Sequence, residues 1–501
     1  MNERFRGMAT FEEILESISD EQMMTSHAGL TLADFGREHP ELDNKTLSPD
    51  EQKLNLAFWA RASAEHVGWD SFGRENNEAF KKAVEKLYAG IGGERKQKDF
   101  MLEVARETSD YILDRHFMLM TGSAHQTGGG AKEAPGVGKN IADSREKPEG
   151  YAVLAEERTK DSFGNECALW QIGTLKQGTE DILVVSIPRL GADGRYDFWK
   201  GFIETFDRIY DGGREKWENG RILLDVRGNG GGEDKPIDHM AKRLYGNLTN
   251  SYKRCEINDS ALSNKFLHDH GAYRESNYAA DGLKKEDLLQ RTHFSGRNQV
   301  LFDETRVYYP FNEREGFKGR LDILIDRGVA SSGESAYTSF YHHPNVRFIG
   351  ENTAGMQQFT QGSFAMPCGY LMRVGVTKLT YWDREGENIE VRGHAPDIAC
   401  TGKNALDMAL TTDRDEGRVK GFRKLNEPAA GKRVFARYDP KAKTDPRKAY
   451  YARYLEPGLA ALEKRNSDRE KRKSLHSVLM NLPQKPAVKA ADLKRFMGTQ
   501  R

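Results

Sequence analysis

The stretch from Leu321 to Glu334, which reads LDILIDRGVASSGE, constrains the fold of this chain more than any other. Its apolar beginning predicts a short buried strand, the letters DRG predict a turn, and a helix is expected from about Ser332. A small-residue turn of this kind can hold a serine out at the end of a sheet, beside helix-start amides that favour negative charge. Ser331 is therefore a candidate nucleophile. The competing interpretation is that Ser331 and Ser332 only cap the helix.

The same order of strand, turn, helix and strand recurs along the chain. Ile182 to Ile187 and Arg221 to Val226 read as buried strands, with a helix expected from Phe198 to Tyr210 between them. The strand at Leu321–Ile325 is followed by its own helix and then by a strand from Val346 to Ile349. Because crossovers of this kind place neighbouring strands in parallel, we predict a mixed α/β (α+β) fold with a partly parallel sheet and flanking helices.

Patterning divides the chain into several regions. Capping signals at Thr10 and at Ser48-Pro49 predict that the first region is an N-terminal helical domain. The predicted order is the helical domain (1–115), a loop-rich connection with the first strands (116–180), the core (181–415) and a basic helical C-terminal region (416–501). A polar, irregular insertion is expected at 250–320 within the core. That insertion and the glycine-rich loop at 121–150 are each long enough to act as a lid or a self-inhibitory segment.

Composition excludes several classes of protein. The 501 residues carry 76 basic and 76 acidic side chains, so no net charge favours a nucleic acid or an anionic membrane as partner. No apolar run approaches the roughly 18–20 residues of a membrane span, and the first residues lack the apolar core of a signal peptide. We therefore expect a cytoplasmic protein, or a secreted or periplasmic one if a signal was removed. Homo-oligomerisation is left open.

Metal and cofactor chemistry has no clear signature in the sequence. The four cysteines lie far apart, with no CxxC or Cys/His cluster, so no metal site and no cofactor is expected. They are Cys167, Cys255, Cys368 and Cys400.

A second turn with chemical potential runs from Gly228 to Gly232 and reads GNGGG. Its three consecutive glycines allow a tight backbone with exposed N–H groups, which suits a phosphate cradle, an oxyanion hole or a purely structural turn. The charges of Glu233 and Asp234 would repel phosphate, and the spacing fits neither GxxxxGK[ST] nor GxGxxG. We favour the oxyanion interpretation.

A serine hydroxyl needs a base to become a nucleophile. Lys378 lies within later strands, with no local signal of activation. His116 stands where a helical pattern changes to a strand before a glycine-rich loop, although it also fits an ordinary helix-end histidine. His394, close to Glu390 in the stretch NIEVRGHAPDI, is a rival base.

Four strings occur in one order: LLDVRGNGGG, LIDRGVASSGE, IGENTAG and VRGHAPDI. Together they resemble peptidase family S41, the tail-specific or C-terminal-processing proteases, over roughly residues 181–410. In the Ser/Lys branch of that family a lysine stands where this chain has Met356. The chain is therefore more similar to the branch without the lysine, which includes tricorn protease and the chlamydial protease-like activity factor.

The resemblance implies roles for particular residues. Ser331 matches the nucleophile, while the amide of Ser332 and a glycine amide of Gly230-Gly231 match the oxyanion hole. Glu390 matches the orienting acid. Asp114-Arg115-His116 is similar to the D-x-H motif that supplies the base in the chlamydial type, whereas the tricorn-type histidine position is Ser186 here.

The implied function is a serine endopeptidase with a Ser-His-Glu triad of Ser331, His116 and Glu390, acting on a protein or peptide substrate. Arg227 and Asp397 are expected to have structural roles, in which they hold the glycine turn and the P-D turn. No PDZ pattern is evident for binding substrate C-termini. The alternative is a non-catalytic protein of the same fold that binds a lipophilic ligand or a peptide, and a scaffold without activity is a third interpretation.

Overall fold

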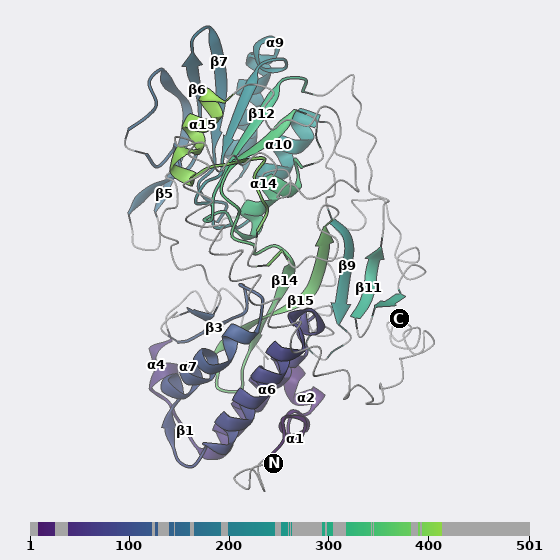
Figure 1. Cartoon of the computed structure of the whole chain (residues 1–501). Helices are drawn as coiled ribbons and strands as arrows, with labels where there is room; N and C mark the ends of the chain where they lie inside the picture. The colour runs from purple at the N-terminus through teal and green to yellow at the C-terminus, as the bar shows by residue number, and fades with distance from the viewer. Residues whose placement is uncertain are drawn as a thin grey trace, which may run out of the picture. The chain divides into compact units, whose positions relative to one another are not determined.

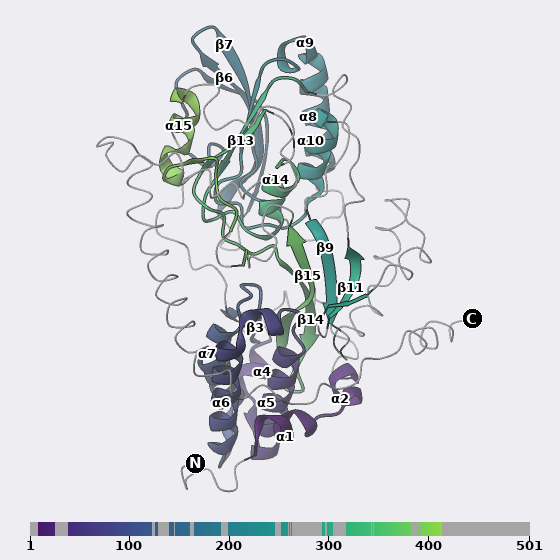
Figure 2. The same ribbon diagram turned by 45° about the vertical axis from the view of Figure 1, so that its right-hand side comes forward.

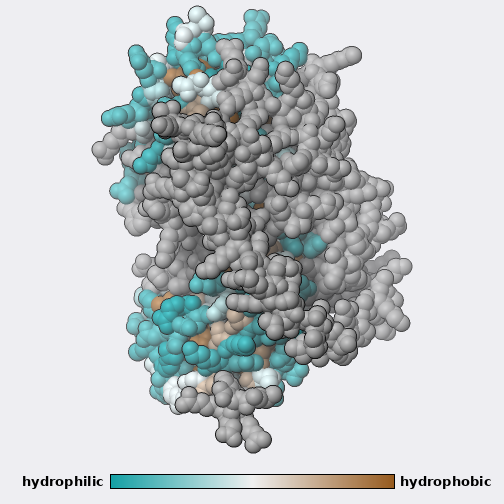
Figure 3. Space-filling view, viewed as in Figure 1, coloured by the Kyte–Doolittle hydropathy of each residue, from teal (hydrophilic) through white to brown (hydrophobic). Residues whose placement is uncertain are grey.

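The fold of the chain is seen in a computed structural model (Figure 1). It describes residues 9–25, 39–122, 126–128, 140–144, 146–160, 165–191, 199–245, 252–258, 260, 262, 293–295, 298–303, 317–341, 343, 345–381, 389–390 and 393–412. The basic region predicted at 416–501 lies outside the described residues. On the face shown in Figure 3 the described surface is mostly hydrophilic. No described helix is long and apolar enough to cross a membrane.

One sheet has seven strands in the order β16-β13-β12-β8-β7-β6-β5, and we call it the parallel sheet. The strands from β16 to β7 pair in parallel, while β6 and β5 pair antiparallel. This confirms the predicted partly parallel sheet. Its members are β5 (Tyr151–Lys160), β6 (Glu166–Gln177), β7 (Glu180–Ser186), β8 (Arg221–Asp225), β12 (Arg320–Ile325), β13 (Val346–Gly350) and β16 (Ile398–Ala399).

Helices cover both faces of the parallel sheet. Helices α8 (Lys200–Gly212), α9 (Arg214–Trp217) and α10 (Lys235–Tyr245) lie on one side, and α15 (Ala405–Thr411) lies on the other (Figure 2). Alternate strand residues supply the two cores. On β8, Ile222 and Leu224 pack toward α8 and α10, whereas Leu223 packs toward α15. Central strands buried on both faces explain the continuous apolar runs of the sequence.

A second, antiparallel sheet has the order β10-β11-β9-β15-β3-β4, with β14 also paired to β15. Its strands are β3 (Met118–Met120), β4 (Gln126–Gly128), β9 (Tyr252–Asn258), β10 (His293–Ser295), β11 (Asn298–Asp303), β14 (Phe359–Ala365) and β15 (Leu371–Tyr381). The prediction of an irregular insertion at 250–320 is wrong for β9, β10 and β11, because they are regular members of this sheet. Their polar composition hid a strand pattern.

The N-terminal region is helical, as predicted, and both capping boxes form. Its helices are α1 (Phe11–Glu16), α2 (Asp20–Thr25), α4 (Pro40–Asn44), α5 (Pro49–Ala64), α6 (Arg74–Ala89) and α7 (Gln97–Thr108), with 3-10 turns η2 (Trp69–Phe72) and η3 (Ser109–Tyr111) and the short strands β1 (Thr46–Leu47) and β2 (Arg95–Lys96). Trp59, Phe80 and Phe100 share one buried core with Phe359 and Val374 of β14 and β15. The helices therefore depend on strands that lie more than 200 residues later in the chain.

The only charge in the apolar part of β12, Asp322, is fully buried and paired on both sides. One oxygen lies 2.7 Å from Nη2 of Arg221 on β8, and the other lies 2.6 Å from Nε of Arg347 on β13. Parallel register explains this, since Asp322 is opposite Arg347 on β13 and opposite Leu223 on β8, two residues from Arg221. Residues two apart in a strand share a face, so all three side chains lie on one side of the sheet. The ion network therefore ties the three central strands together.

Replacing Asp322 by alanine should destabilise the protein by about 3–5 kcal/mol, because two buried guanidinium groups would lose their carboxylate. Equilibrium unfolding in denaturant, followed by circular dichroism, measures the loss. The control is Glu204→Ala on α8, which removes an exposed i,i+4 ion pair with Lys200 and should change stability very little. Equal effects of the two substitutions would contradict the role of the buried network.

Candidate active site

Ser331 lies just beyond the carboxyl end of β12, at the start of the 3-10 turn η4 (Ser331–Glu334). Helix α14 (Ser335–Thr338) continues the turn, so the predicted helix is present but much shorter than its pattern suggested. The backbone φ of Ser331 is 52°, in the left-handed region that residues with a Cβ rarely adopt. Such strain costs on the order of 1–3 kcal/mol and gathers at functional sites. The side chain is partly exposed.

The glycine turn that follows β8 lies directly against Ser331. A Cβ on Gly231 would sit 2.7 Å from the Ser331 Cβ and 3.0 Å from the Ser332 amide nitrogen. Gly231 also has a φ of 102°, so both space and conformation demand glycine there. At Gly230, by contrast, an added Cβ would meet nothing within 4 Å. The two turns predicted to act together are therefore in contact.

Asn229 joins these two turns and is fully buried. Its Nδ2 donates to the Ile187 carbonyl at 2.8 Å, and its Oδ1 accepts from the Gly231 N–H at 2.9 Å. Its backbone carbonyl accepts from the Ala330 N–H at 2.9 Å, beside Ser331. Since the Gly231 N–H is engaged in this way, the amides of Gly230 and Ser332 are the better candidates for holding an oxyanion.

Asp326, just beyond the end of β12, also joins the turns that follow β8 and β12. Its Oδ1 accepts from the Gly228 N–H and from the Gly328 N–H, each at 2.9 Å. Burial raises the pKa of Asp326 to about 6, although the two amides and Arg227 favour its charged form. Arg227 itself pairs with Asp225 at 2.7 Å and donates to the Gly402 carbonyl. This arrangement supports the structural role expected for Arg227.

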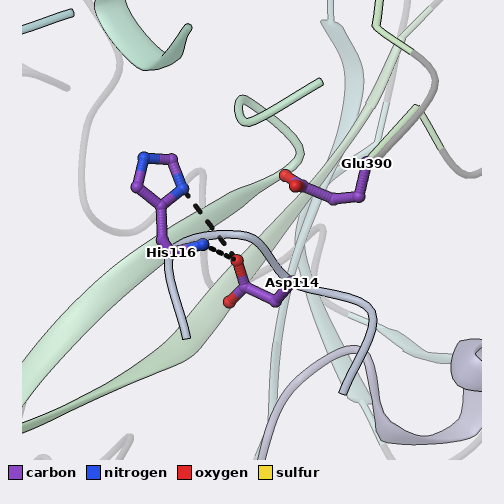
Figure 4. Close-up of side chains that lie close together, drawn as sticks. All are labelled: Asp114, His116 and Glu390. Atoms are coloured by element: carbon purple, nitrogen blue, oxygen red, sulfur yellow. Dashed lines mark hydrogen bonds and ion pairs between the residues drawn. The ribbon is translucent and has the colours of Figure 1, made fainter. Parts of the chain in front are cut away.

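His116 lies two residues before β3, in a buried group with Asp114 and Glu390 (Figure 4). One ligating atom of each residue lies within 4.8 Å of the others. The Asp114 Oδ1 accepts from the His116 backbone N–H at 2.8 Å and is 3.9 Å from the His116 Nδ1. The carboxyl of Glu390 points toward the same group (Figure 4). The structure thus brings His116 and Glu390 together, as predicted, and adds Asp114.

The imidazole of His116 is suited to accept a proton. Only 7% of the residue is exposed, and its Nδ1 has no hydrogen-bond partner in the described part of the chain. Burial lowers the pKa of His116 below its ordinary value, an effect that Asp114 opposes and Arg373 strengthens. A neutral imidazole at neutral pH is the form that a general base requires.

Two buried glutamates link Ser331 to this group. Glu334, in the same turn as Ser331, accepts from the Gly355 N–H at 3.0 Å and the Met356 N–H at 2.7 Å. Two residues further along that loop, the Gln358 N–H donates to Glu390 Oε1 at 2.9 Å. Burial raises the pKa of Glu334 above its ordinary value. Burial also raises the pKa of Glu390, and the negative charges of Asp114 and Glu334 add to this effect, so that this pKa lies well above its ordinary value.

The group around His116 could in principle hold a metal ion, because imidazole nitrogen and carboxylate oxygens are common ligands. The charge of Arg115 acts on Glu390, and that of Arg373 acts on His116. The positive charges of these two arginines would repel a bound cation. All four carboxylate oxygens of Asp114 and Glu390 already accept hydrogen bonds, which fits a proton-transfer site better.

The rival base His394, and the two positions where other branches of the family keep their base, are placed differently. Met356, at the position of the missing lysine, packs against Ala330 and Ala354. His394 is fully buried, and its ring stacks on Tyr337 with centroids 4.3 Å apart. Ser186 hydrogen-bonds to Asn140 within the core. Each of these side chains has a packing role.

The predicted site residues therefore form two groups: Ser331, Ser332, Gly230 and Gly231 at the strand ends, and His116 with Glu390. In the described part of the chain no hydrogen bond joins the Ser331 hydroxyl to the His116 ring. Sequence reasoning missed Asn229, Asp326 and Glu334 as supports, since each looked like an ordinary polar residue. For Asp114, the D-x-H motif was a signal that could have been pursued.

Comparison with known protein families matches residues 182–400 to peptidase family S41. The resemblance to this family is thereby confirmed for that segment. No curated protein matches the chain.

Three similar solved structures are remote. A candidate peptidase from Parabacteroides merdae has 14% identity and a TM-score of 0.46, covering 73% of this chain and 98% of that chain. The photosystem II D1 C-terminal processing protease has 11% identity and a TM-score of 0.34, and the match covers 74% of this chain and 99% of that protease. Mature CPAF complexed with lactacystin has 14% identity and a TM-score of 0.33, and the match covers 56% of this chain and 58% of the CPAF chain.

A matched pair of glycine substitutions tests the contact between the two turns. Gly231→Ala should lower the free energy of unfolding by about 2–3 kcal/mol, because the new Cβ collides with Ser331 in a strained backbone. Gly230→Ala adds the same atom to open space and should leave stability nearly unchanged. Equilibrium unfolding of both variants is the measurement. Equal stability of the two would show that the turns do not pack as described.

Proposed function

Residues 182–400 belong to peptidase family S41, and on that basis we propose that the chain is a serine endopeptidase with Ser331 as its nucleophile. The observation that carries the proposal is the strained backbone of Ser331, with φ 52°, held against the Gly231 turn. A strained backbone persists only where surrounding contacts offset its free-energy cost, and it is typical of a nucleophile held on a sharp turn at the end of a sheet strand. A serine that only capped a helix would adopt an extended backbone instead.

In the proposed mechanism His116 removes the hydroxyl proton of Ser331 as the Oγ attacks a peptide carbonyl carbon. The carbonyl oxygen becomes an oxyanion that the amides of Ser332 and of the Gly230-Gly231 turn stabilise, each donor contributing on the order of 10²–10³ in rate. His116 then returns the proton to the leaving amine. Water then attacks the acyl carbon while His116 takes a proton from it. His116 gives this proton to the Ser331 Oγ as the bond between that oxygen and the acyl carbon breaks, which releases the carboxylic acid and restores the serine.

Glu390 is the orienting acid of the proposed triad, and Asp114 shares that task. Asp114 is directly hydrogen-bonded to the backbone of His116 and lies 3.9 Å from its Nδ1. The raised pKa of Glu390 means that its carboxyl holds a proton more readily than an ordinary glutamate. We therefore propose that Asp114 supplies more of the negative charge that stabilises a protonated His116, while Glu390 fixes the surrounding backbone.

A fluorophosphonate probe tests the nucleophile and the base together. We expect label on Ser331, no label in Ser331→Ala, and a loss of at least about 10³-fold in labelling rate in His116→Ala, because the serine would lack its base. Mass spectrometry locates the label, and cleavage of denatured casein measures turnover. His394→Phe keeps a ring on Tyr337 and is the control.

If His394→Phe is inactive while His116→Ala is labelled normally, the base is assigned wrongly. If the unmodified chain takes no label on Ser331, the proposal of a serine peptidase is contradicted, and a binding protein of this fold becomes the better account. Organic extraction of the purified chain would then show whether it carries a lipophilic ligand.

The labelling rate should depend on pH in a direction that the burial of His116 sets. Because burial lowers the pKa of His116 below 6.5, the imidazole is neutral above that pKa and becomes protonated as the pH falls through it. We expect the labelling rate to rise with pH and to reach half its plateau below pH 6.5. A midpoint clearly above that value would mean that the nearby carboxylates outweigh burial.

A further inference from the structure

Another buried histidine, His66, contacts the candidate site from the N-terminal helices. It follows α5 by two residues and is fully buried. Its Nε2 lies 2.9 Å from Asp114 Oδ2. Its Nδ1 accepts from the Gly68 N–H at 2.8 Å, so the ring proton must be on Nε2. His66 therefore donates a hydrogen bond to Asp114 in a fixed direction.

Asp114 is held between two histidines. Its Oδ2 accepts a hydrogen bond from the His66 Nε2–H, and its Oδ1 accepts one from the backbone N–H of His116 at 2.8 Å. A carboxylate bonded through both oxygens cannot rotate without losing one of these bonds. The position of Oδ1, 3.9 Å from His116 Nδ1, is thus set in part by His66.

The surroundings of His66 are closely packed. A Cβ on Gly375 of β15 would sit 2.4 Å from His66 Nε2 and 3.1 Å from Asp114 Oδ2. The rings of Phe72 and Phe359 have centroids 4.8 Å and 4.9 Å from that of His66. An apolar side chain would fill the space between these rings, but it would remove the bonds that His66 makes to Asp114 Oδ2 and to the Gly68 N–H. The imidazole therefore serves these two polar partners as well as the packing.

We propose that His66 is a positioning residue of the candidate active site, which sets the orientation of His116 through the carboxylate of Asp114. The proposal rests on the proposed function and deepens it, because it makes the end of α5 a part of the machinery. His66 touches no substrate and transfers no proton. It keeps Asp114 aligned so that the His116 ring presents its other nitrogen, Nε2, for proton transfer.

Three substitutions separate the two hydrogen bonds of His66. The amide nitrogen of glutamine takes the place of Nε2 and can donate to Asp114, whereas the amide oxygen of asparagine takes the place of Nδ1 and can accept from Gly68. His66→Leu provides neither bond. We expect His66→Leu and His66→Asn to lose about 10- to 100-fold in the rate constant of Ser331 labelling, and His66→Gln to recover most of it.

The readout is saturation kinetics of the fluorophosphonate reaction, with thermal unfolding measured beside it. A positioning role lowers the maximal rate constant and leaves the reversible affinity for the probe unchanged. A purely structural role would make labelling follow thermal stability, with asparagine doing as well as glutamine. That pattern, or normal labelling of His66→Leu, would overturn the proposal while leaving Ser331 as the nucleophile.

Nuclear magnetic resonance of chain labelled with ¹⁵N-histidine gives a test that does not need activity. The ring nitrogen shifts of His116 should change in His66→Leu and His66→Asn and stay close to those of the unmodified chain in His66→Gln. If the unmodified chain takes no label, the proposed function fails but these shifts still decide whether His66 orients His116. Identical His116 shifts in all variants would refute the coupling.

Discussion

The close approach of two strand-end turns is the constraint on which the candidate site depends. Strands β8 and β12 pair in parallel, with Asp225 opposite Leu324, so their carboxyl ends meet at one edge of the sheet. Gly231 then comes so near to Ser331 that no side chain fits. The buried side-chain oxygens of Asn229 and Asp326 hold the turns by accepting hydrogen bonds from backbone amides of the turns. These bonds offset the cost of a left-handed Ser331, which is on the order of 1–3 kcal/mol.

Strand β15 joins the other half of the site to the rest of the protein. It pairs with β3, which follows His116, and with β14 and β9. Its Gly375 gives space to His66 and Asp114, and residues of β14 and β15 complete the core of the N-terminal helices. The position of His116 therefore depends on packing between the first helices and strands far along the chain.

The sequence predicted the parts of the fold that local pattern controls. Buried strands such as β8 and β12 are apolar on both faces, and the helices at Pro49 and Phe11 begin with capping boxes, so each could be found from neighbouring residues. The residues that act through distant partners could not. Asn229 and Glu334 are polar residues whose function depends on loops that the fold brings to them. Strands β9 (YKRCEIN) and β11 (NQVLFD) mix polar and apolar residues without a clear alternation, and their place in the sheet comes from pairing, of β9 with β15 and of β11 with β9.

The candidate site shows the same division. Ser331, the glycine turn, His116 and Glu390 are candidates because motifs in a fixed order resemble peptidase family S41. His66 was not one of them, because a single histidine after a helix carries no signal until Asp114 and Gly375 are placed around it. Its hydrogen bond is a property of the tertiary structure alone, since only the folded chain brings these partners together.

The central claim is that the nucleophile turn and the His116 group form one reaction centre. A crystal structure of the chain after reaction with a fluorophosphonate tests this most directly. The account predicts phosphorus bonded to Ser331 Oγ, its oxygen about 3 Å from the amides of Ser332 and Gly230, and the His116 Nε2 within hydrogen-bond reach of the adduct. An adduct oxygen directed into solvent, with His116 turned away from Ser331, would contradict the claim.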